Sequence, residues 1–524
     1  MTLVAGADFG TLSVRVTIMD TTDGAVLGSA VASYPLHRSD SDPHVARQSH
    51  DDQMNALCEA MRAATAKAGV DGQTVAAFAA DTTGSSVIPL DETLQPLAQY
   101  YLWCDHTAHA EAAEITERAR AEGIEGIDWC GGVYSHEWGY SKLLHFLRHN
   151  PDQRDRLATA AENCDMIAAT LCGITSVSQM PRSVCAMGHK WMWGEKWGGL
   201  PPQDFLSRVD PLLDGINDKL GGRWGHSLDR AGTLSPHWAE RMGLAPGIPI
   251  PIGAFDAHWD SVGTGCAPGD VVNVVGTSTC IIALADANSG PVAGICGAVP
   301  DSVMPGSIGL EAGQSATGDV FDAIAQRAGS DVATLCAGLE DHRPGASGLL
   351  RVPWDNGDRT VLVRPDLGGM TLGWDLGHTP ADEMHAAIEG MAMHVSLIID
   401  RMASGGTAFT RVINAGGIPQ KNDVLNQVYA DVLARDVHVP EHSPVGVGAC
   451  IFAALAAGSF DSIAAAQEKM APPMRRFRPR ADRAAAYATL SGLFNDVYFA
   501  FGEGRPCDMG RILPTLRRFR LGEI

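Results

Sequence analysis

The sequence predicts an α/β protein with two domains. The chain has 524 residues, and 45% of them are hydrophobic, which is more than a single hydrophobic core usually holds. Strand-like apolar runs alternate with segments whose apolar residues recur at helical spacing. Two segments far apart in the chain also share one layout, in which a strand ends at Gly-Thr and a second strand follows. The repeated layout indicates that one ligand is held from two sides.

The first of these segments begins the chain. It predicts a strand from Val4 to the turn Gly10-Thr11, a strand over Ser13–Asp20, a turn at Asp23-Gly24 and a strand over Val26–Val31. A glycine between two strands lets the backbone approach a phosphate closely, and the N–H and hydroxyl groups that follow can donate to its oxygens. We therefore expect Gly10 and Thr11 to bind phosphate.

The second segment repeats this pattern past the middle of the chain. A strand over Val271–Val275 leads to Gly276, Thr277, Ser278 and Thr279, then to a strand over Cys280–Asp286, a turn at Ser289-Gly290 and a strand from Val292. The same backbone argument predicts a second phosphate turn over residues 276–279. Together the two turns are typical of a polyphosphate site.

Local patterns place several further elements. We expect a helix over residues 57–68, a strand over Val75–Ala80, a helix over Ala381–Met402 and a buried strand over Val412–Ala415. The chain becomes rich in Pro and Gly over residues 231–252, which predicts a boundary near Gly253 between a first domain, 1–253, and a second, 254–524. Residues 475–480 are expected to form a solvated basic loop before the final helices, which are candidates for packing back on the first domain.

Composition excludes several classes of partner. The formal net charge of -22 argues against nucleic acid or an anionic membrane surface, because such binding needs Lys and Arg facing phosphates. No apolar run reaches the roughly 20 residues of a membrane span, and the N-terminus lacks a signal pattern, so we expect a cytoplasmic protein. The twelve cysteines are scattered without a Cys-x-x-Cys pair and are expected to be reduced and structural.

Two motifs fit nucleotide and metal binding. Asp8 stands at the end of a strand beside the first phosphate turn, where a carboxylate can hold Mg²⁺, although an Asx turn is the simpler structural explanation. Gly416 and Gly417 follow an apolar strand and precede Asn422, which leaves room for a flat ring or a ribose. Glycine pairs in turns are common, so it is their order after two phosphate turns that favours an adenosine pocket.

A third motif fits a phosphoryl acceptor. Asp256 precedes the second phosphate turn and could accept the proton of a substrate hydroxyl, although a lone Asp in a turn is often structural. With Lys190 and Glu311 it forms a set of charged groups able to clamp several hydroxyls. His189 and His258 are expected to be structural histidines rather than ligands.

Other catalytic classes fit poorly. The sequence has no His-Glu-x-x-His run and no Gly-x-x-x-x-Gly-Lys-Ser/Thr loop, which excludes zincin and Walker-type sites. The segments that begin at Asp8 and Asp81 suggest an aspartic protease dyad, but neither is Asp-Thr-Gly, and an acidic α/β chain is a poor host for that all-β class.

The chain resembles the FGGY family of carbohydrate kinases, and within it the branch that phosphorylates ribulose. The stretches that carry the resemblance occur in the family's order across almost the whole chain; they are residues 6–11, 81–86, 101–106, 182–190, 197–202, 276–280, 309–316 and 416–418. One departure is visible: residues 137–142, Glu-Trp-Gly-Tyr-Ser-Lys, lack a proline that many members carry before the lysine.

The resemblance implies two ribonuclease-H-like domains of the actin and hexokinase type, with the active site in the cleft between them. It implies ATP and Mg²⁺ as cofactors, phosphorylation of ribulose at its terminal hydroxyl, and possible homodimers. Asp256 matches the catalytic base, and Lys190, Glu311 and Gly84 match sugar-contacting positions. The nucleotide positions are matched by Asp8, Gly10 and Thr11, by Gly276 to Thr279, and by Gly416, Gly417 and Asn422.

Three alternatives remain open from the sequence. The substrate could be another ketose or a pentitol, such as xylulose, erythrulose, ribitol or arabinitol, because discrimination by single hydroxyls depends on geometry that no motif reports. An actin- or Hsp70-like ATPase would share the phosphate turns but would not need Lys190, Asp256 and Glu311. A catalytically idle sugar-binding regulator is disfavoured by the presence of Asp8 and Asp256.

Overall fold

The computed structural model describes residues 2–524, which divide into two compact units. Unit 1 contains residues up to Gly265 together with 297–309 and 444–471, and unit 2 contains residues 266–296, 310–443 and 472–524. We expected one boundary near Gly253. The compact units instead separate at Gly265, and the chain returns to unit 1 twice, because two later segments pack against elements of unit 1.

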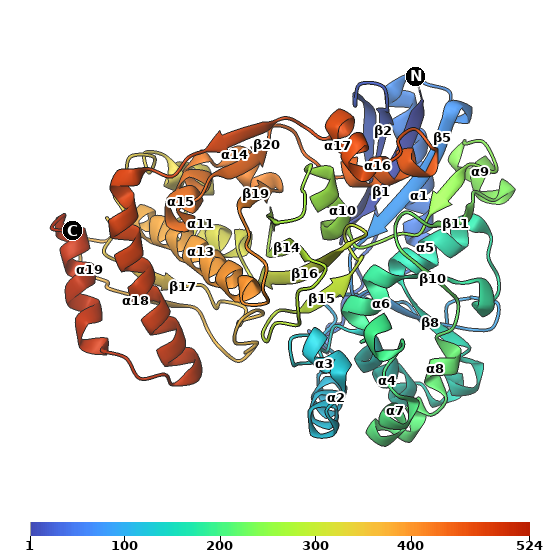
Figure 1. Ribbon diagram of the computed structural model, residues 1–524, viewed down its shortest axis with the longest axis horizontal. Helices are drawn as coiled ribbons and strands as arrows, with labels where there is room; N and C mark the ends of the chain where they lie inside the picture. Colours follow the sequence, from blue (N-terminus) through green and yellow to red (C-terminus); the bar gives the residue numbers. More distant parts are fainter. Residues whose placement is uncertain (1) are drawn as a thin grey trace. The chain divides into compact units, whose positions relative to one another are not determined.

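Unit 1 is built on a four-stranded sheet in the order β3-β2-β1-β5 (Figure 1). Its strands are β1 (Leu3–Phe9), β2 (Ser13–Asp20), β3 (Val26–Ser33) and β5 (Val75–Thr82). The first three pair antiparallel in succession, and β5 pairs parallel with β1. The strands expected at the start of the chain and at Val75–Ala80 are therefore confirmed.

Helices cover this sheet. Helix α1 (His50–Ala68) begins after Ser49, whose side chain accepts from the Asp52 N–H, and ends at Gly69 in the left-handed region, so the expected helix is confirmed. It packs on β2 and β3, while α16 (Val447–Ala456) packs on β1 and β5. At Gly6 an added Cβ would lie 2.7 Å from the Ala449 Cβ, so this close approach of α16 requires glycine.

Unit 1 also contains a second sheet, in the order β4-β7-β6-β8, and further short strands and helices. They are β4 (Arg47–Gln48), β6 (Val87–Leu90), β7 (Tyr100–Tyr101), α2 (His109–Glu122), α3 (Glu125–Trp129), α4 (Gly139–His149), β8 (Thr159–Glu162), α5 (Asn163–Cys172), β9 (Pro181–Ser183), α6 (Val184–Lys190), α7 (Gln203–Val209), α8 (Ile216–Lys219), β10 (Arg223–Gly225), β11 (Arg230–Thr233), α9 (Pro236–Met242), β12 (Pro249–Pro251), α10 (Asp256–Gly263), β15 (Gly297–Pro300) and α17 (Ile463–Met470).

Unit 2 contains a sheet with the order β16-β14-β13-β19-β20-β21. Its strands are β13 (Asp270–Val275), β14 (Thr279–Asp286), β16 (Ser307–Gln314), β19 (Arg411–Ala415), β20 (Val437–Pro440) and β21 (Met474–Phe477). The hairpin of β13 and β14 and the buried strand β19 confirm the expectations for residues 271–286 and 412–415. The prediction of a third strand from Val292 is wrong, because residues 287–296 form no strand. Val292 is instead buried in a loop, where it packs beside Gly405.

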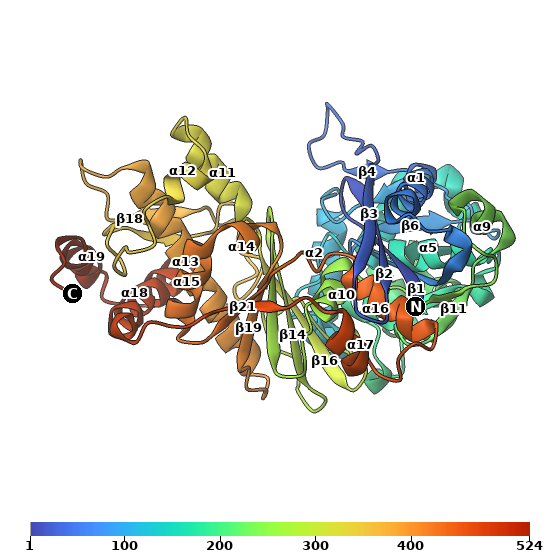
Figure 2. The ribbon, with the colours of Figure 1, turned by 90° about the horizontal axis from the view of Figure 1, so that it is seen from above.

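Helices of unit 2 pack on one another beside this sheet (Figure 2). The expected helix is confirmed as α13 (Pro380–Ala403), which starts at a capping box formed by Thr379 and Asp382. The others are α11 (Gly318–Arg327), α12 (Val332–Cys336), α14 (Gly417–Lys421), α15 (Asp423–Leu433), α18 (Ala484–Glu503) and α19 (Ile512–Leu521), with a short pair of strands, β17 (Leu350–Val352) and β18 (Met370–Leu372).

The last part of the chain differs from expectation. The final helices α18 and α19 belong to unit 2, where α18 packs on α13 and α15. The basic segment is not a solvated loop, because β21 pairs antiparallel with β20. Its arginines instead form ion pairs: Arg475 with Asp423 at 2.7 Å, Arg476 with Asp436, and Arg480 with Asp431 at 2.6 Å.

None of the twelve cysteines, all within residues 2–524, is part of a disulfide bond, and seven of them are buried. Among residues 2–524, no helix combines the length and apolar character that a membrane span requires.

Candidate active site

Four aspartates of unit 1 form a cluster at the ends of β1 and β5 and in α10; we call Asp8, Asp81, Asp256 and Asp260 the aspartate cluster. Asp8 and Asp81 are register partners in the parallel pair β1–β5. Burial is the main cause that raises the pKa of Asp8, to about 6, and an Asp81 hydrogen bond counteracts it. Burial and then repulsion from neighbouring aspartates hold the pKa of both Asp81 and Asp260 well above the usual range.

The chemistry of this cluster fits a divalent cation. Buried carboxylates that repel one another bind a hard cation favourably, because the ion removes the repulsion and replaces lost water. Asp260 is 6% exposed, and its Oδ1 has no hydrogen-bond partner among the described residues. Asp8 is the member next to the phosphate turn, so the residues present fit the Mg²⁺ that the sequence implied.

The two Gly-Thr turns have the same local construction. The Gly10 N–H donates to the Ser13 carbonyl at 3.0 Å, and the Gly276 N–H donates to the Ser278 carbonyl at 2.9 Å. Neither glycine has a positive φ, and an added Cβ would meet only one backbone oxygen, at 3.5 Å for Gly10 and 3.7 Å for Gly276. The fold itself would tolerate alanine at both positions. What glycine leaves there is open space above each turn, which fits the approach of a phosphate.

Side chains hold both turns in place. The Thr11 hydroxyl accepts from Trp103 Nε1 at 3.1 Å, and the Thr11 carbonyl accepts from Gln48 Nε2 at 2.6 Å. In unit 2 the buried Thr279 hydroxyl is 2.8 Å from the Thr317 hydroxyl. These contacts fix the backbone N–H groups in position before any ligand binds.

Lys190 and Asp256 lie on neighbouring short helices of unit 1. Lys190 ends α6, is 2% exposed, and places its Nζ 5.4 Å from the Trp138 ring centre and 5.3 Å from the Phe255 ring centre. Asp256 opens α10 directly after Phe255, and its Oδ1 accepts from the Ala257 N–H. The two aromatic rings therefore hold the Lys190 ammonium beside the start of α10.

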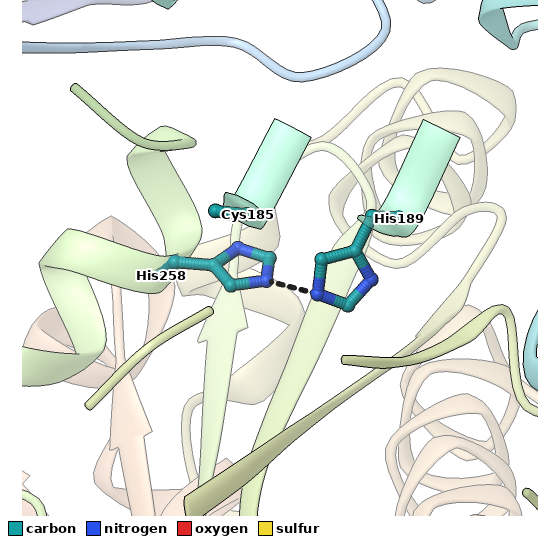
Figure 3. Close-up of side chains that lie close together, drawn as sticks. All are labelled: Cys185, His189 and His258. Carbon is teal, nitrogen blue, oxygen red and sulfur yellow. Dashed lines mark hydrogen bonds between the residues drawn. The ribbon is translucent and has the colours of Figure 1, made fainter. Parts of the chain in front are cut away.

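A histidine pair joins these helices (Figure 3). His189 Nε2 lies 3.0 Å from His258 Nε2, and both rings are buried, with Cys185 one turn before His189 on α6. One of the two nitrogens must carry a proton and donate, and the other must accept. The pair ties the helix that carries Lys190 to the helix that carries Asp256.

The turn that contains Gly84 is held by a buried lysine. An added Cβ at Gly84 would meet the Phe255 ring at 3.1 Å, so glycine is needed for this packing. The next residue, Ser85, has a φ of 59, which is unusual for a side-chain-bearing residue. Lys142 Nζ donates to the Ser85 carbonyl at 2.6 Å, and also to the carbonyls of Tyr101 at 3.2 Å and Leu102 at 2.6 Å.

Glu162 completes this buried network. Its Oε2 accepts from the Ser86 N–H at 3.0 Å, and its Oε1 accepts from Trp191 Nε1 at 3.1 Å. Burial lowers the pKa of Lys142 to about 7, and it raises the pKa of Glu162 against the attraction of Lys142 and Lys190. Glu162 thus links the Gly84 turn to the residue that follows Lys190.

Unit 2 carries the other predicted sugar contact and a nucleotide-sized pocket. Glu311 on β16 is 5% exposed, and its Oε1 accepts from Arg359 Nη2 at 3.3 Å. The pocket has a volume of about 850 Å³ and is lined by Gly276, Thr277, Gly417 and Asn422 among others. Asn422 also caps α15 by accepting from the Leu425 N–H.

Gly416 fixes the backbone conformation beside this pocket. Its φ is 97, and an added Cβ would lie 2.4 Å from the Val275 carbonyl oxygen, so no other residue fits without a backbone shift. Gly417 has no atom within 4 Å of an added Cβ, which leaves open space in the pocket. Ser278, Thr279 and Gly416 do not themselves line the pocket.

Several residues escaped the sequence analysis. Asp260, Glu162 and Arg359 belong to no recognised motif, and no role was assigned to Asp81 or Lys142. The sequence offers one signal for buried polar residues, which is a charged residue in or next to an apolar run. Asp81 directly follows Val75–Ala80, and Glu162 directly follows Ala160-Ala161. This signal shows that a group is buried but not which partner it meets.

The fold and these sites define a two-domain α/β carbohydrate kinase. The family model for the N-terminal domain of the FGGY family of carbohydrate kinases matches residues 3–188, and the model for its C-terminal domain matches residues 271–457. The chain belongs to the FGGY family, whose members use ATP to phosphorylate sugars.

Individual proteins agree with this assignment. The chain is 34% identical to a ribulokinase of Vibrio parahaemolyticus, over 93% of this chain and 95% of that protein, and 33% identical to a ribulokinase of Halalkalibacterium halodurans, over 97% and 96%. Among solved structures, xylulose kinase from Rhodospirillum rubrum superposes with a TM-score of 0.82 at 20% identity, covering 98% of this chain and all of that one. Plasmodium falciparum glycerol kinase with ADP gives 0.79 at 15% identity, covering 95% and 98%.

Proposed function

We propose that the protein transfers the γ-phosphoryl group of Mg-ATP to the 5-hydroxyl of ribulose and forms ribulose 5-phosphate. The observation that carries the substrate assignment is the identity of 33–34% with two ribulokinases over nearly the full length of all three chains. Features of each unit support the same reaction: unit 1 carries the aspartate cluster, the buried Lys190 and one phosphate turn, and unit 2 carries the other phosphate turn and the pocket.

Asp256 is assigned as the general base. A carboxylate at the first position of α10 can accept the proton of the attacking hydroxyl as that oxygen bonds to phosphorus and the bond to the β-phosphate oxygen breaks. The proton then resides on Asp256 until product leaves. Phosphoryl transfer otherwise needs mainly positioning and charge stabilisation, so this one proton transfer is the only covalent task assigned to a side chain.

Lys190, Glu311 and Gly84 are assigned to the sugar. Lys190 is held between two aromatic rings and supplies an ammonium donor, while Glu311 is oriented by Arg359 and supplies a carboxylate acceptor for hydroxyls. Gly84 presents backbone without a side chain beside Phe255. Buried charged groups reject analogues that lack the matching hydroxyl, because they would be left unpaired.

The nucleotide is assigned to the two Gly-Thr turns and the unit 2 pocket. Gly10 and Thr11, together with Gly276 to Thr279, donate backbone N–H and hydroxyl groups to phosphate oxygens. Gly417 and Asn422, which line the pocket, accept the adenosine, and Gly416 sets the backbone conformation just before them. Asp8 holds Mg²⁺, directly or through water, and the ion neutralises charge on the transferring group.

A coupled assay of ADP release tests this function. The purified protein is mixed with Mg-ATP and separately with L-ribulose, D-ribulose, ribitol, L-arabinitol, D-xylulose or glycerol, with a sugar-free reaction as control. We expect turnover with ribulose to exceed that with xylulose and glycerol by at least tenfold. A preference for xylulose or a pentitol would overturn the assignment of ribulose as the substrate but would still support a sugar kinase. Equal turnover without sugar would favour an actin-like ATPase instead.

A further inference from the structure

Four histidines and a glutamate gather on unit 1 outside the aspartate cluster; we call His44, His106, His109, His136 and Glu137 the histidine cluster. They come from three separate segments: the loop after β3, the residues around the start of α2, and the residues just before α4. His106, His136 and Glu137 each offer a ligand atom, and these atoms lie within 4.8 Å of one another.

The rings of this cluster face one another closely. The centres of the His106 and His136 rings are 4.6 Å apart, with the ring planes at 74°. The exposed His44 ring lies 6.3 Å from His106 and 6.1 Å from His109. The backbone fixes part of this arrangement, because the His106 N–H donates to the His44 carbonyl at 2.9 Å.

We propose that the histidine cluster binds one transition-metal ion of the zinc class through His106, His136 and Glu137, with His44 or His109 as a further ligand. Imidazole nitrogens with one carboxylate are a donor set that Zn²⁺ prefers, whereas Mg²⁺ prefers oxygen ligands. The ion is therefore distinct from the one assigned to Asp8.

A buried, unsatisfied ring nitrogen supports the site. His136 Nε2 is inaccessible to solvent and has no hydrogen-bond partner among the described residues, which normally costs free energy. A metal–nitrogen bond would satisfy this atom.

The charges around the cluster act in both directions. Lys142 and Arg38 are cations near His106, and Glu137 is a nearby carboxylate. The two cations oppose a metal ion, and the Glu137 carboxylate favours it.

The ion would connect two segments that matter for the sugar site. Residues 103–106 follow Leu102, whose carbonyl accepts from Lys142, and Glu137 precedes Trp138, whose ring contacts Lys190. Binding would therefore restrict the motion of both segments, which we expect to appear as a higher thermal midpoint.

Titration of the untagged, metal-free protein tests the proposal. Isothermal calorimetry with ZnCl₂, without nucleotide, should show one saturable site, and MgCl₂ should not fill it. Cobalt(II) at the same stoichiometry should give the visible absorption of a low-coordinate site with nitrogen ligands. The substitutions His136→Gln and His106→Gln should each weaken zinc binding at least tenfold and abolish the rise in thermal midpoint.

Three control variants separate this site from others. His237→Gln alters an exposed histidine at the start of α9, Asp8→Asn alters the aspartate cluster, and His258→Gln alters the buried histidine pair; all three should bind zinc as the parent protein does. Circular dichroism of each variant checks that it is folded. The proposal is overturned if the parent shows no saturable zinc binding, or if both His136→Gln and His106→Gln bind zinc unchanged.

Discussion

Asp8 on β1 and Asp81 on β5 are register partners in a parallel pair of buried strands. The pKa of Asp81 is held well above the usual range by burial and then by the charges of Asp8 and its neighbours, while the Asp81 hydrogen bond counteracts the rise at Asp8. Burial and the charge of Asp8 therefore favour the protonated form of Asp81, whereas Asp8 is the more acidic of the two. This makes Asp81 a positioning residue for the proposed metal ligand.

The pH dependence of activity should follow Asp8. Burial raises its pKa to about 6, so Asp8 becomes protonated at a higher pH than an ordinary aspartate and loses affinity for a cation there. We expect kcat/KM for Mg-ATP to fall about tenfold per pH unit below pH 6. A profile measured at saturating sugar checks this. An acid limb that begins only near pH 4 would contradict the role of Asp8.

The thermal stability of the variant Asp81→Asn tests the raised pKa of the buried Asp81 carboxyl. Folded Asp81 keeps its proton where the unfolded chain releases it, so the free energy of unfolding contributed by this site falls as pH rises above 3.8. Asparagine does not titrate. The variant should therefore gain thermal stability at pH 7 without Mg²⁺, by about 2–4 °C for each kcal/mol, and gain less at pH 4.5. Asp366→Asn on the surface should show no gain, and an equal gain at both pH values would contradict the assignment.

Lys142→Met should impair the sugar site selectively. The substitution removes three hydrogen bonds to main-chain carbonyls and leaves buried Glu162 without its nearby cation, a loss of about 3–5 kcal/mol. In protein that remains folded, we expect the KM for ribulose to rise at least tenfold and the KM for ATP to stay within twofold.

The matched control for this substitution is Lys196→Met. Lys196 is 65% exposed, forms a surface ion pair with Glu125 and lies over the Trp129 ring, so its loss should change neither constant. Equal increases in both KM values for Lys142→Met would show a general structural role instead.

Gly417→Leu should affect the nucleotide alone. Gly417 lines the unit 2 pocket, and an added Cβ would meet no atom within 4 Å, so the fold tolerates a side chain that occupies ligand space. We expect the KM for ATP to rise at least tenfold with an unchanged thermal midpoint. Gly492→Ala in α18 is the control, because a Cβ added at Gly492 also has no atom within 4 Å. This variant should leave ATP binding intact and stabilise the protein by about 0.5–1 kcal/mol. An unchanged KM for ATP in Gly417→Leu would contradict the assignment of the adenosine to this pocket.

Asp256→Asn should separate binding from chemistry. Asparagine keeps the size of the side chain but cannot accept the proton, so we expect kcat to fall at least 100-fold while ATP binding, measured by calorimetry, changes less than threefold. Retained turnover would exclude Asp256 as the base.

The parts of the fold that local patterns encode were predictable from the sequence. The hairpins at Gly10 and Gly276 follow from alternating apolar residues that meet at a Gly-Thr turn, and α13 follows from its own cap. The return of α16 to unit 1 was not predictable, because it depends on packing against β1 more than 400 residues earlier in the chain. β21 was missed because ion pairs with distant aspartates offset its basic character.

The same distinction holds for the site. Asp8, Gly10, Gly276 and Asp256 stand in short motifs with a recognisable order. Partnerships between residues depend on strand register and on contacts between distant segments, so the sequence did not reveal that Asp81 faces Asp8 or that Lys142 holds the turn at Ser85.

Phosphorus-31 NMR of the product tests the central claim most directly. The protein is incubated with Mg-ATP and L-ribulose, and the phosphorus spectrum is recorded with proton coupling. The account predicts a phosphomonoester whose phosphorus couples to the two protons of C5, with ADP formed in equal amount. ADP accompanied by inorganic phosphate, with no sugar ester, would contradict it.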